Sequence, residues 1–142
     1  YIGKRRIRSF LIVGASDAQG NPAIFSNFGQ KQVDVFAPGE SINSTVSGNK
    51  YSQQGGTSMA SPMVAGVAAI LMAYYPELSA IQVKNIIMQT AVTRRGGTVS
   101  RSLGYSLYSG TVQIPFASLC IAGGIVNAYE AVKMADQIVN KR

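Results

Sequence analysis

The chain contains no histidine among its 142 residues and only one cysteine, Cys120. Without histidine, a serine in this chain has no imidazole to accept its proton, so these residues alone cannot form a Ser-His-Asp triad. A single cysteine excludes an internal disulfide. Because its neighbours are apolar, we expect Cys120 to be a buried side chain rather than a reactive thiol.

Acidic residues are also scarce, with six Asp and Glu against thirteen Lys and Arg, which gives a formal net charge of +7. Four of the basic residues lie within 4–8, and no aromatic residues interleave with the basic clusters. We therefore expect a solvated surface rather than a nucleic-acid partner, and an acidic remainder of a longer protein would balance the charge. No cluster of His, Cys, Asp and Glu has metal-ligand spacing, so we expect no metal.

Long apolar runs are absent as well. The run Met63–Tyr75 is apolar or small on every side, which predicts a helix buried in a core. With about 13 residues it is shorter than the roughly 20 that cross a membrane, so no membrane partner is expected. The chain is 46% hydrophobic and 13% charged, which is typical of one globular domain with a sizeable core.

The most informative motif is the sequence GGTSMASPMVAG over residues 55–66. Its glycines allow close backbone approach, Thr57 is expected to cap a helix or to lend its hydroxyl to an anion site, and Ser58 falls in the first helical turn. Free N–H groups and the positive helix end would there stabilise a developing oxyanion. We expect Pro62 to lie early enough in the helix that its missing N–H costs little. Ser58 is thus the candidate nucleophile, with Thr57 and Gly56 as oxyanion and cleft support.

This motif resembles the nucleophile region of the subtilisin-like serine proteases (subtilases, peptidase S8), GTSMA(S/T)PHVAG, at ten of eleven positions. Met63 replaces a histidine that is not the catalytic one. The segments FLIVGASD (10–17), AIFSNFG (23–29), VDVFAPG (33–39) and GGIVNA (123–128) are similar to further family segments. The resemblance covers most of residues 10–92 and 121–135. It implies an α/β fold, namely the C-terminal portion of a three-layer, parallel-sheet subtilase domain with a buried nucleophile helix.

The resemblance also implies that the catalytic aspartate, the histidine and the oxyanion asparagine lie upstream of Ser58. We therefore interpret residues 1–142 as the C-terminal portion of a catalytic domain, made by truncation or cleavage, and expect it to be inactive alone. Its expected partners are a peptide or protein substrate and the upstream half of the domain. Exposed apolar edges would also favour dimerisation or strand exchange. The family further suggests secretion or a cell-envelope location, and calcium binding through loops that these residues do not identify.

Two alternatives remain open. Sedolisins are related enzymes with Ser-Glu-Asp chemistry and an acidic optimum, although the MASP continuation after Ser58 favours the subtilisin branch. A non-catalytic pseudoprotease fragment that binds peptides or protein partners belongs to another functional class, and the intact GTSMASP run argues against it.

Secondary structure follows from periodicity and turn signals. Strands are expected at Phe10–Gly14 and Val33–Phe36, and a hairpin at Ile42–Val46 and Tyr51–Gln54. Ser79 with Gln82, and Asn127 with Glu130, predict capping boxes for two further helices, the first reaching about Ala91. Their expected core stripes are Val83, Ile86, Ile87 and Ala91, then Ala128, Val132, Ala135 and Val139.

Two single aspartates and the segment 93–120 are interpreted as structural features. Asp17 lies among turn-forming residues, and Asp34 alternates with valines, so both are expected to be structural. Residues 93–120 are rich in turn signals, predict a short edge strand at Val112–Phe116, and are interpreted as an inserted loop or hairpin with a possible docking role.

Overall fold

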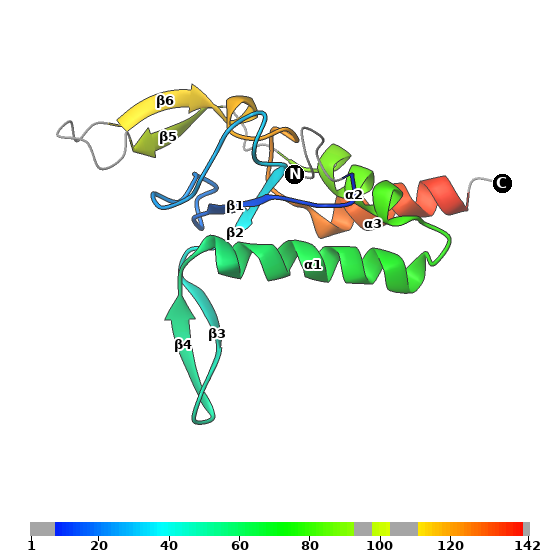
Figure 1. Cartoon of the computed structure of the whole chain (residues 1–142), viewed down its shortest axis with the longest axis horizontal. Helices are drawn as coiled ribbons and strands as arrows, with labels where there is room; N and C mark the ends of the chain where they lie inside the picture. The colour runs from blue at the N-terminus through cyan, green and yellow to red at the C-terminus, as the bar shows by residue number, and fades with distance from the viewer. Residues whose placement is uncertain (1–7, 93–97, 103–110, 141–142) are drawn as a thin grey trace.

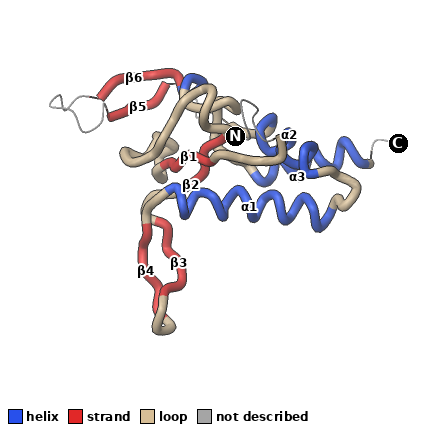
Figure 2. The backbone as a smooth tube through the Cα atoms, viewed as in Figure 1, coloured by secondary structure: helices blue, strands red, loops and turns tan. Residues whose placement is uncertain are grey.

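The computed structural model describes residues 8–92, 98–102 and 111–140. At its centre two short parallel strands, β1 (Val13–Ser16) and β2 (Val35–Pro38), pair in the register Val13 to Val35 and Ser16 to Pro38. Helices cover one side of this pair and an irregular loop layer covers the other (Figures 1 and 2). The fold is therefore α/β with parallel strands, as predicted.

The remaining elements follow in chain order. They are β3 (Ile42–Val46), β4 (Lys50–Gln54), α1 (Thr57–Tyr74), α2 (Ala80–Gln89), β5 (Thr98–Ser102), β6 (Thr111–Pro115), a 3-10 turn (Phe116–Ser118) and α3 (Ala128–Val139). Helix α1 packs against β1, β2, α2 and α3. The hairpin β3–β4 leads directly into α1 and projects away from the helices (Figure 1).

Alternation along β2 divides the core into two clusters. Val35 and Ala37 join the cluster formed with α1, α2 and α3, whereas Phe36 belongs to a second cluster with Phe116 and Cys120. The rings of Phe36 and Phe116 meet edge to face, with centroids 5.3 Å apart. Successive side chains of a strand point to opposite faces, so a strand buried on both sides reads as a continuous apolar run.

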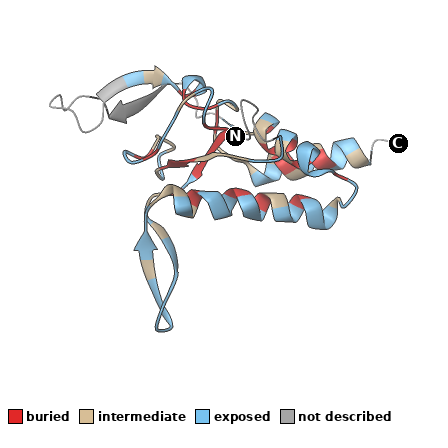
Figure 3. Ribbon diagram, viewed as in Figure 1, coloured by how far each residue is buried: buried red, intermediate tan, exposed pale blue. Residues whose placement is uncertain are grey.

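Helix α1 departs from the prediction that it is buried all round. Its buried residues, Ala60, Val64, Val67 and Leu71, form a single stripe, while the opposite face is exposed (Figure 3). Four large apolar or aromatic side chains on α1 are 40–77% exposed, namely Met63, Ile70, Met72 and Tyr74. By length and composition the helix would also pass as a membrane span, a test that the core helix of a globular protein passes too.

The capping prediction is confirmed for α2. Ser79 and Gln82 form a capping box, and Val83, Ile86 and Ile87 are buried as predicted. The helix ends at Gln89, two residues early, with Thr90 as its C-cap. There Thr90 Oγ1 donates a 2.7 Å hydrogen bond to Ile86 O.

Helix α3 agrees with its prediction in part. Asn127 caps it, because its side chain accepts a 3.0 Å hydrogen bond from Glu130 N. Only this half of the predicted capping box forms, since the Glu130 carboxylate lies 3.9 Å from Lys133 Nζ. The buried stripe consists of Ala131 and Ala135, whereas Ala128 is exposed.

Strand boundaries are shifted from the sequence expectations. Strand β1 begins at Val13 rather than Phe10, because the Asp34 carboxylate takes the N–H of Ile12 just ahead of the first ladder pair. Strand β2 is shifted two residues along the chain, from the expected Val33–Phe36 to Val35–Pro38. The hairpin β3–β4 forms as predicted, with Lys50 added to its second strand, and Gly48 in its turn has φ 79°.

Within 93–120, β5 and β6 pair antiparallel. Strand β6 spans Thr111–Pro115 rather than the expected Val112–Phe116, and the 3-10 turn begins at Phe116. The Arg94–Arg95 pair and the tyrosine-rich run at 103–110 lie outside the described residues. The interpretation of 93–120 as an insertion stays a prediction.

Candidate active site

Ser58 is the second residue of α1 and is exposed. Gly56, with φ 159° and ψ 160°, is the N-cap, and among the described residues no side chain caps this helix end. The expectation that Thr57 caps the helix is therefore wrong: Thr57 is the first helical residue. Gly55 is exposed and Gly56 is partly exposed, so solvent reaches the helix end along these two glycines.

The first turn of α1 presents free backbone donors beside the Ser58 hydroxyl. Met59 N and Ala60 N both donate to Gly56 O, at 3.0 and 3.3 Å. The preceding N–H groups, those of Thr57 and Ser58, have no intrahelical acceptor, because a helix begins with unsatisfied N–H groups. The partial positive charge of the helix N-terminus adds to these donors. The local geometry thus suits an oxyanion formed at Ser58.

Pro62 lies deeper in the helix than the sequence suggested. It is the sixth residue of α1, so its missing N–H removes the usual i+4 donor to the carbonyl of Ser58. Pro62 therefore leaves the main chain of Ser58 less tied into the helix than that of its successors.

A cavity of about 600 Å³ opens beside Ser58. One wall is the extended segment 10–13, and the other is the first two turns of α1, through Thr57, Ser58, Ser61 and Pro62. The two walls come from segments more than forty residues apart in sequence. They differ in character, since the first is apolar and the second carries three hydroxyl groups.

The carboxylates of Asp17 and Asp34 bond to groups other than Ser58. Asp17 accepts hydrogen bonds from Gln19 N, Asn21 N and Asn21 Nδ2 at 2.8–3.1 Å, which fixes a turn as expected. Asp34 is buried, accepts from Ile12 N at 2.8 Å, and pairs with Lys84. In the part of the chain that the structure describes, no carboxylate or amine is hydrogen-bonded to Ser58, and no three His, Cys, Asp or Glu residues gather as a metal site.

Cys120 is fully buried, in the second cluster. Burial raises the pKa of its thiol, and backbone hydrogen bonds involving Gly124, Gly123 and Ala122 act in the opposite direction. The thiol donates to Gly124 O at 3.6 Å. A thiol that is hard to ionise and lies away from the cavity is a packing residue.

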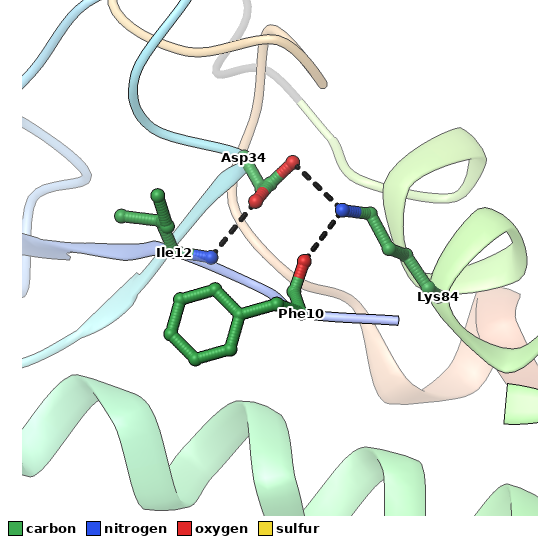
Figure 4. Close-up of polar contacts among 4 residues, drawn as sticks. All are labelled: Phe10, Ile12, Asp34 and Lys84. Atoms are coloured by element: carbon green, nitrogen blue, oxygen red, sulfur yellow. Dashed lines mark hydrogen bonds and ion pairs between the residues drawn. The ribbon is translucent and has the colours of Figure 1, made fainter. Parts of the chain in front are cut away.

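Sequence reasoning missed Lys84, whose ammonium reaches from α2 to Asp34 and to the main chain of Phe10 (Figure 4). The only available signal is that Lys84 interrupts the apolar residues of α2 next to the buried Val83. A lysine at such a position reads more readily as solvated than as buried.

Comparison with known proteins identifies relatives of this arrangement. The model of the subtilase family (peptidase S8) matches residues 5–106. Subtilisin DY of Bacillus licheniformis is 45% identical over 102 residues, which are 72% of this chain and 34% of that protein. Alkaline elastase YaB of Bacillus sp. (strain YaB) is 42% identical over 99 residues, 70% of this chain and 26% of that protein.

Solved structures give the same result. The self-cleaved protease domain of PatA aligns with a TM-score of 0.65 and 27% identity, over 90% of this chain and 42% of that one. The prenylagaramide maturation protease PagA aligns with a TM-score of 0.65 and 29% identity, over 89% and 43%. The chain spans about a third of the length of subtilisin DY and less than half of each solved domain. Because the family model covers most of its length, the chain belongs to the subtilase family of serine proteases.

Proposed function

We propose that the protein acts as a subtilisin-type serine endopeptidase in which Ser58 is the acyl-enzyme nucleophile. The observation that carries this proposal is the position of Ser58, which is exposed in the first turn of α1 at the rim of a cavity. In the proposed reaction Ser58 Oγ attacks a peptide carbonyl, and the N–H of Ser58 stabilises the oxyanion. Gly56 leaves room for the substrate at the uncapped helix end, and Thr57 lies on the cavity wall.

The proton of Ser58 must pass to a base outside these 142 residues, because the chain has no histidine. We propose that the rest of a subtilase domain supplies the histidine, the aspartate that orients it and the asparagine that completes the oxyanion site. The isolated chain is then inactive towards peptides. No calcium site is assigned, since the described residues bring no group of three acids together to supply several oxygen ligands.

The exposed face of α1 is the proposed contact for that remaining part of the domain. Beside the four exposed large apolar or aromatic side chains, α1 exposes small residues, namely Ala65, Gly66, Ala69 and Ala73. Small side chains allow another layer of structure to approach closely, and an apolar face of this extent is typical of an interaction surface. Without the partner, the same face would favour dimerisation of the chain.

The substrate class in this proposal is peptides or proteins, and the resemblance to the subtilisin-like proteases favours a secreted or cell-envelope enzyme. Ser58→Ala tests the nucleophile directly. In the full-length protein it should abolish peptide hydrolysis and labelling by a fluorophosphonate, with little change in the unfolding midpoint, because one exposed hydroxyl is removed.

Ser61→Ala is the matched control, since Ser61 is also exposed and also lines the cavity. It should keep both the labelling and the hydrolysis. Turnover retained by Ser58→Ala would overturn the assignment. A full-length protein that folds, contains no upstream histidine and does not label would instead support the pseudoprotease alternative.

A further inference from the structure

Strand β1 pairs with β2 along one edge only. On that edge the carbonyls of Ile12 and Ser16 accept main-chain hydrogen bonds from the residues that flank β2, at 2.8 and 3.0 Å. The backbone groups of alternate residues in a strand point to opposite edges. Leu11, Val13 and Ala15 therefore direct their N–H and C=O groups to the outer edge, away from β2.

A loop occupies this outer edge at Ala15. Ala15 N donates a 2.8 Å hydrogen bond to Ser26 Oγ, and Ala15 O accepts a 2.9 Å hydrogen bond from Ala23 N. Ser26 is buried and donates to Asn27 O at 2.9 Å, so the loop is fixed where it meets the strand. A further strand that adds to β1 must therefore end its pairing before Ala15.

Leu11 and Val13 leave the rest of the outer edge open. In the part of the chain that the structure describes, neither residue has a main-chain partner on this side. Residues 11–13 are half-buried, whereas residues 14–16 are buried. The cavity of about 600 Å³ beside Ser58 runs along this open part of the edge. Unpaired N–H and C=O groups in a row are a template for pairing with another strand.

The layers on either side of the open edge indicate the chemistry of a strand that would fit there. Leu11 and Val13 pack against the cluster formed with the helices, whereas Ile12 packs against the second cluster. A strand that continues the sheet would meet one layer on each face, and strands buried on both faces are apolar along their length. The chain spans about a third of the length of subtilisin DY, so a full-length protein of that size has the residues to supply such a strand.

We infer that the main chain of Leu11 and Val13 is a docking edge for one apolar β-strand from the rest of the proposed domain. This inference rests on the part of the proposed function that places the chain within a longer subtilase domain. Ala15, where the pairing must stop, lies next to Gly39, and so does Gly56 in the turn before Ser58. The added strand therefore ends level with that turn, and the chain that joins it there passes close to Ser58.

Amide hydrogen exchange in the full-length protein tests the edge at single residues. The amides of Leu11 and Val13 should exchange at least about a hundredfold more slowly than in an unstructured peptide of the same sequence, as should the amide of Ala15. The amide of Ile24 is the matched control, because Ile24 is 75% exposed and its N–H has no hydrogen-bond partner among the described residues. It should exchange at nearly the peptide rate. Less slowing at either Leu11 or Val13 would overturn the docking edge.

Photo-cross-linking identifies what covers the edge. In one protein p-benzoylphenylalanine replaces Phe10, which lines the cavity and is 57% exposed. In the control it replaces Tyr51, which is 72% exposed on β4, in the hairpin that projects away from the helices (Figure 1). The probe at residue 10 should form an intramolecular cross-link to an apolar segment outside residues 1–142, and the probe at residue 51 should not reach that segment. A cross-link to a second copy of the protein, or none outside residues 1–142, would overturn the proposed occupant.

Both measurements are independent of activity. Protection at Leu11 and Val13 in a full-length protein whose Ser58 neither labels nor cleaves would support the docking edge and refute the protease function. Labelling of Ser58 with an unprotected edge would overturn the docking edge alone.

Discussion

Gly56 N donates a 2.8 Å hydrogen bond to the carbonyl oxygen of Gly39, which ties the turn before Ser58 to the residue that follows β2. The approach is so close that a β-carbon on Gly39 would lie 2.7 Å from Ala15 Cβ, 2.9 Å from Gly56 O and 3.0 Å from Ala60 Cβ. The sheet end and the start of α1 therefore approach very closely at Gly39, whose near neighbours are Ala15, Gly56 and Ala60, and this contact fixes the position of the turn before Ser58.

Gly39→Ala should therefore displace the turn before Ser58. Overpacking a tight core contact of this kind costs about 1–3 kcal/mol of unfolding free energy. Urea unfolding should show this loss, and fluorophosphonate labelling of Ser58 in the full-length protein should slow. An alanine variant with unchanged stability and labelling would mean that the turn can shift without consequence.

Sequence reasoning predicted the turn that leads into α1 because its signals are local. A double glycine, a serine and a run of small apolar residues predict a helix with a reactive N-terminus, and α1 begins at Thr57 as a consequence. The capping box at Ser79 is likewise encoded within four residues. Such features can be predicted because backbone donors are satisfied by neighbours in sequence.

Contacts between distant segments were not predictable in the same way. The Lys84–Asp34 pair joins residues fifty positions apart, and nothing in the local pattern around Lys84 specifies its partner. The half-exposed state of α1 was missed for a related reason. Apolarity on all sides of a helix predicts burial, but it does not say which part of a protein provides the cover.

Two buried serines next to or within β1 differ in whether their hydroxyl groups are hydrogen-bonded. Ser26 Oγ accepts a 2.8 Å hydrogen bond from Ala15 N and donates at 2.9 Å to Asn27 O. Ser16 Oγ is also buried but has no hydrogen-bond partner among the described residues. Ser26→Ala should cost about 1–3 kcal/mol because it leaves Ala15 N unsatisfied, whereas Ser16→Ala should be neutral or stabilising. Equal losses for the two variants in urea unfolding would contradict this reasoning.

The buried thiol of Cys120 predicts a loss of stability at alkaline pH. Burial raises its pKa in the folded state above the usual value, which is about 8.5 in an unfolded chain. Its contribution is therefore fully present below the unfolded pKa and is lost as pH rises through the folded pKa. Unfolding free energy should fall more steeply with pH above about 8.5 in the unmodified chain than in Cys120→Ala. Indistinguishable slopes would argue against the raised pKa.

Gly66 lies on the exposed face of α1, and a β-carbon built there meets nothing within 4 Å. In the isolated chain Gly66→Ala should therefore raise the unfolding free energy by about 0.5–1 kcal/mol, because alanine favours the helix over glycine. A glycine at an open helix position has a steric reason only if another layer of structure packs closely on it. In the full-length protein the same substitution should therefore be destabilising, because the added methyl would meet that layer.

Thermal unfolding of the isolated chain and of the full-length protein measures the two effects of Gly66→Ala. The reverse change on the same face, Ala69→Gly, should lower the unfolding free energy of the isolated chain. Stabilisation of both forms by Gly66→Ala would show that this face stays open, and the proposed contact of α1 with the rest of the domain would then be wrong.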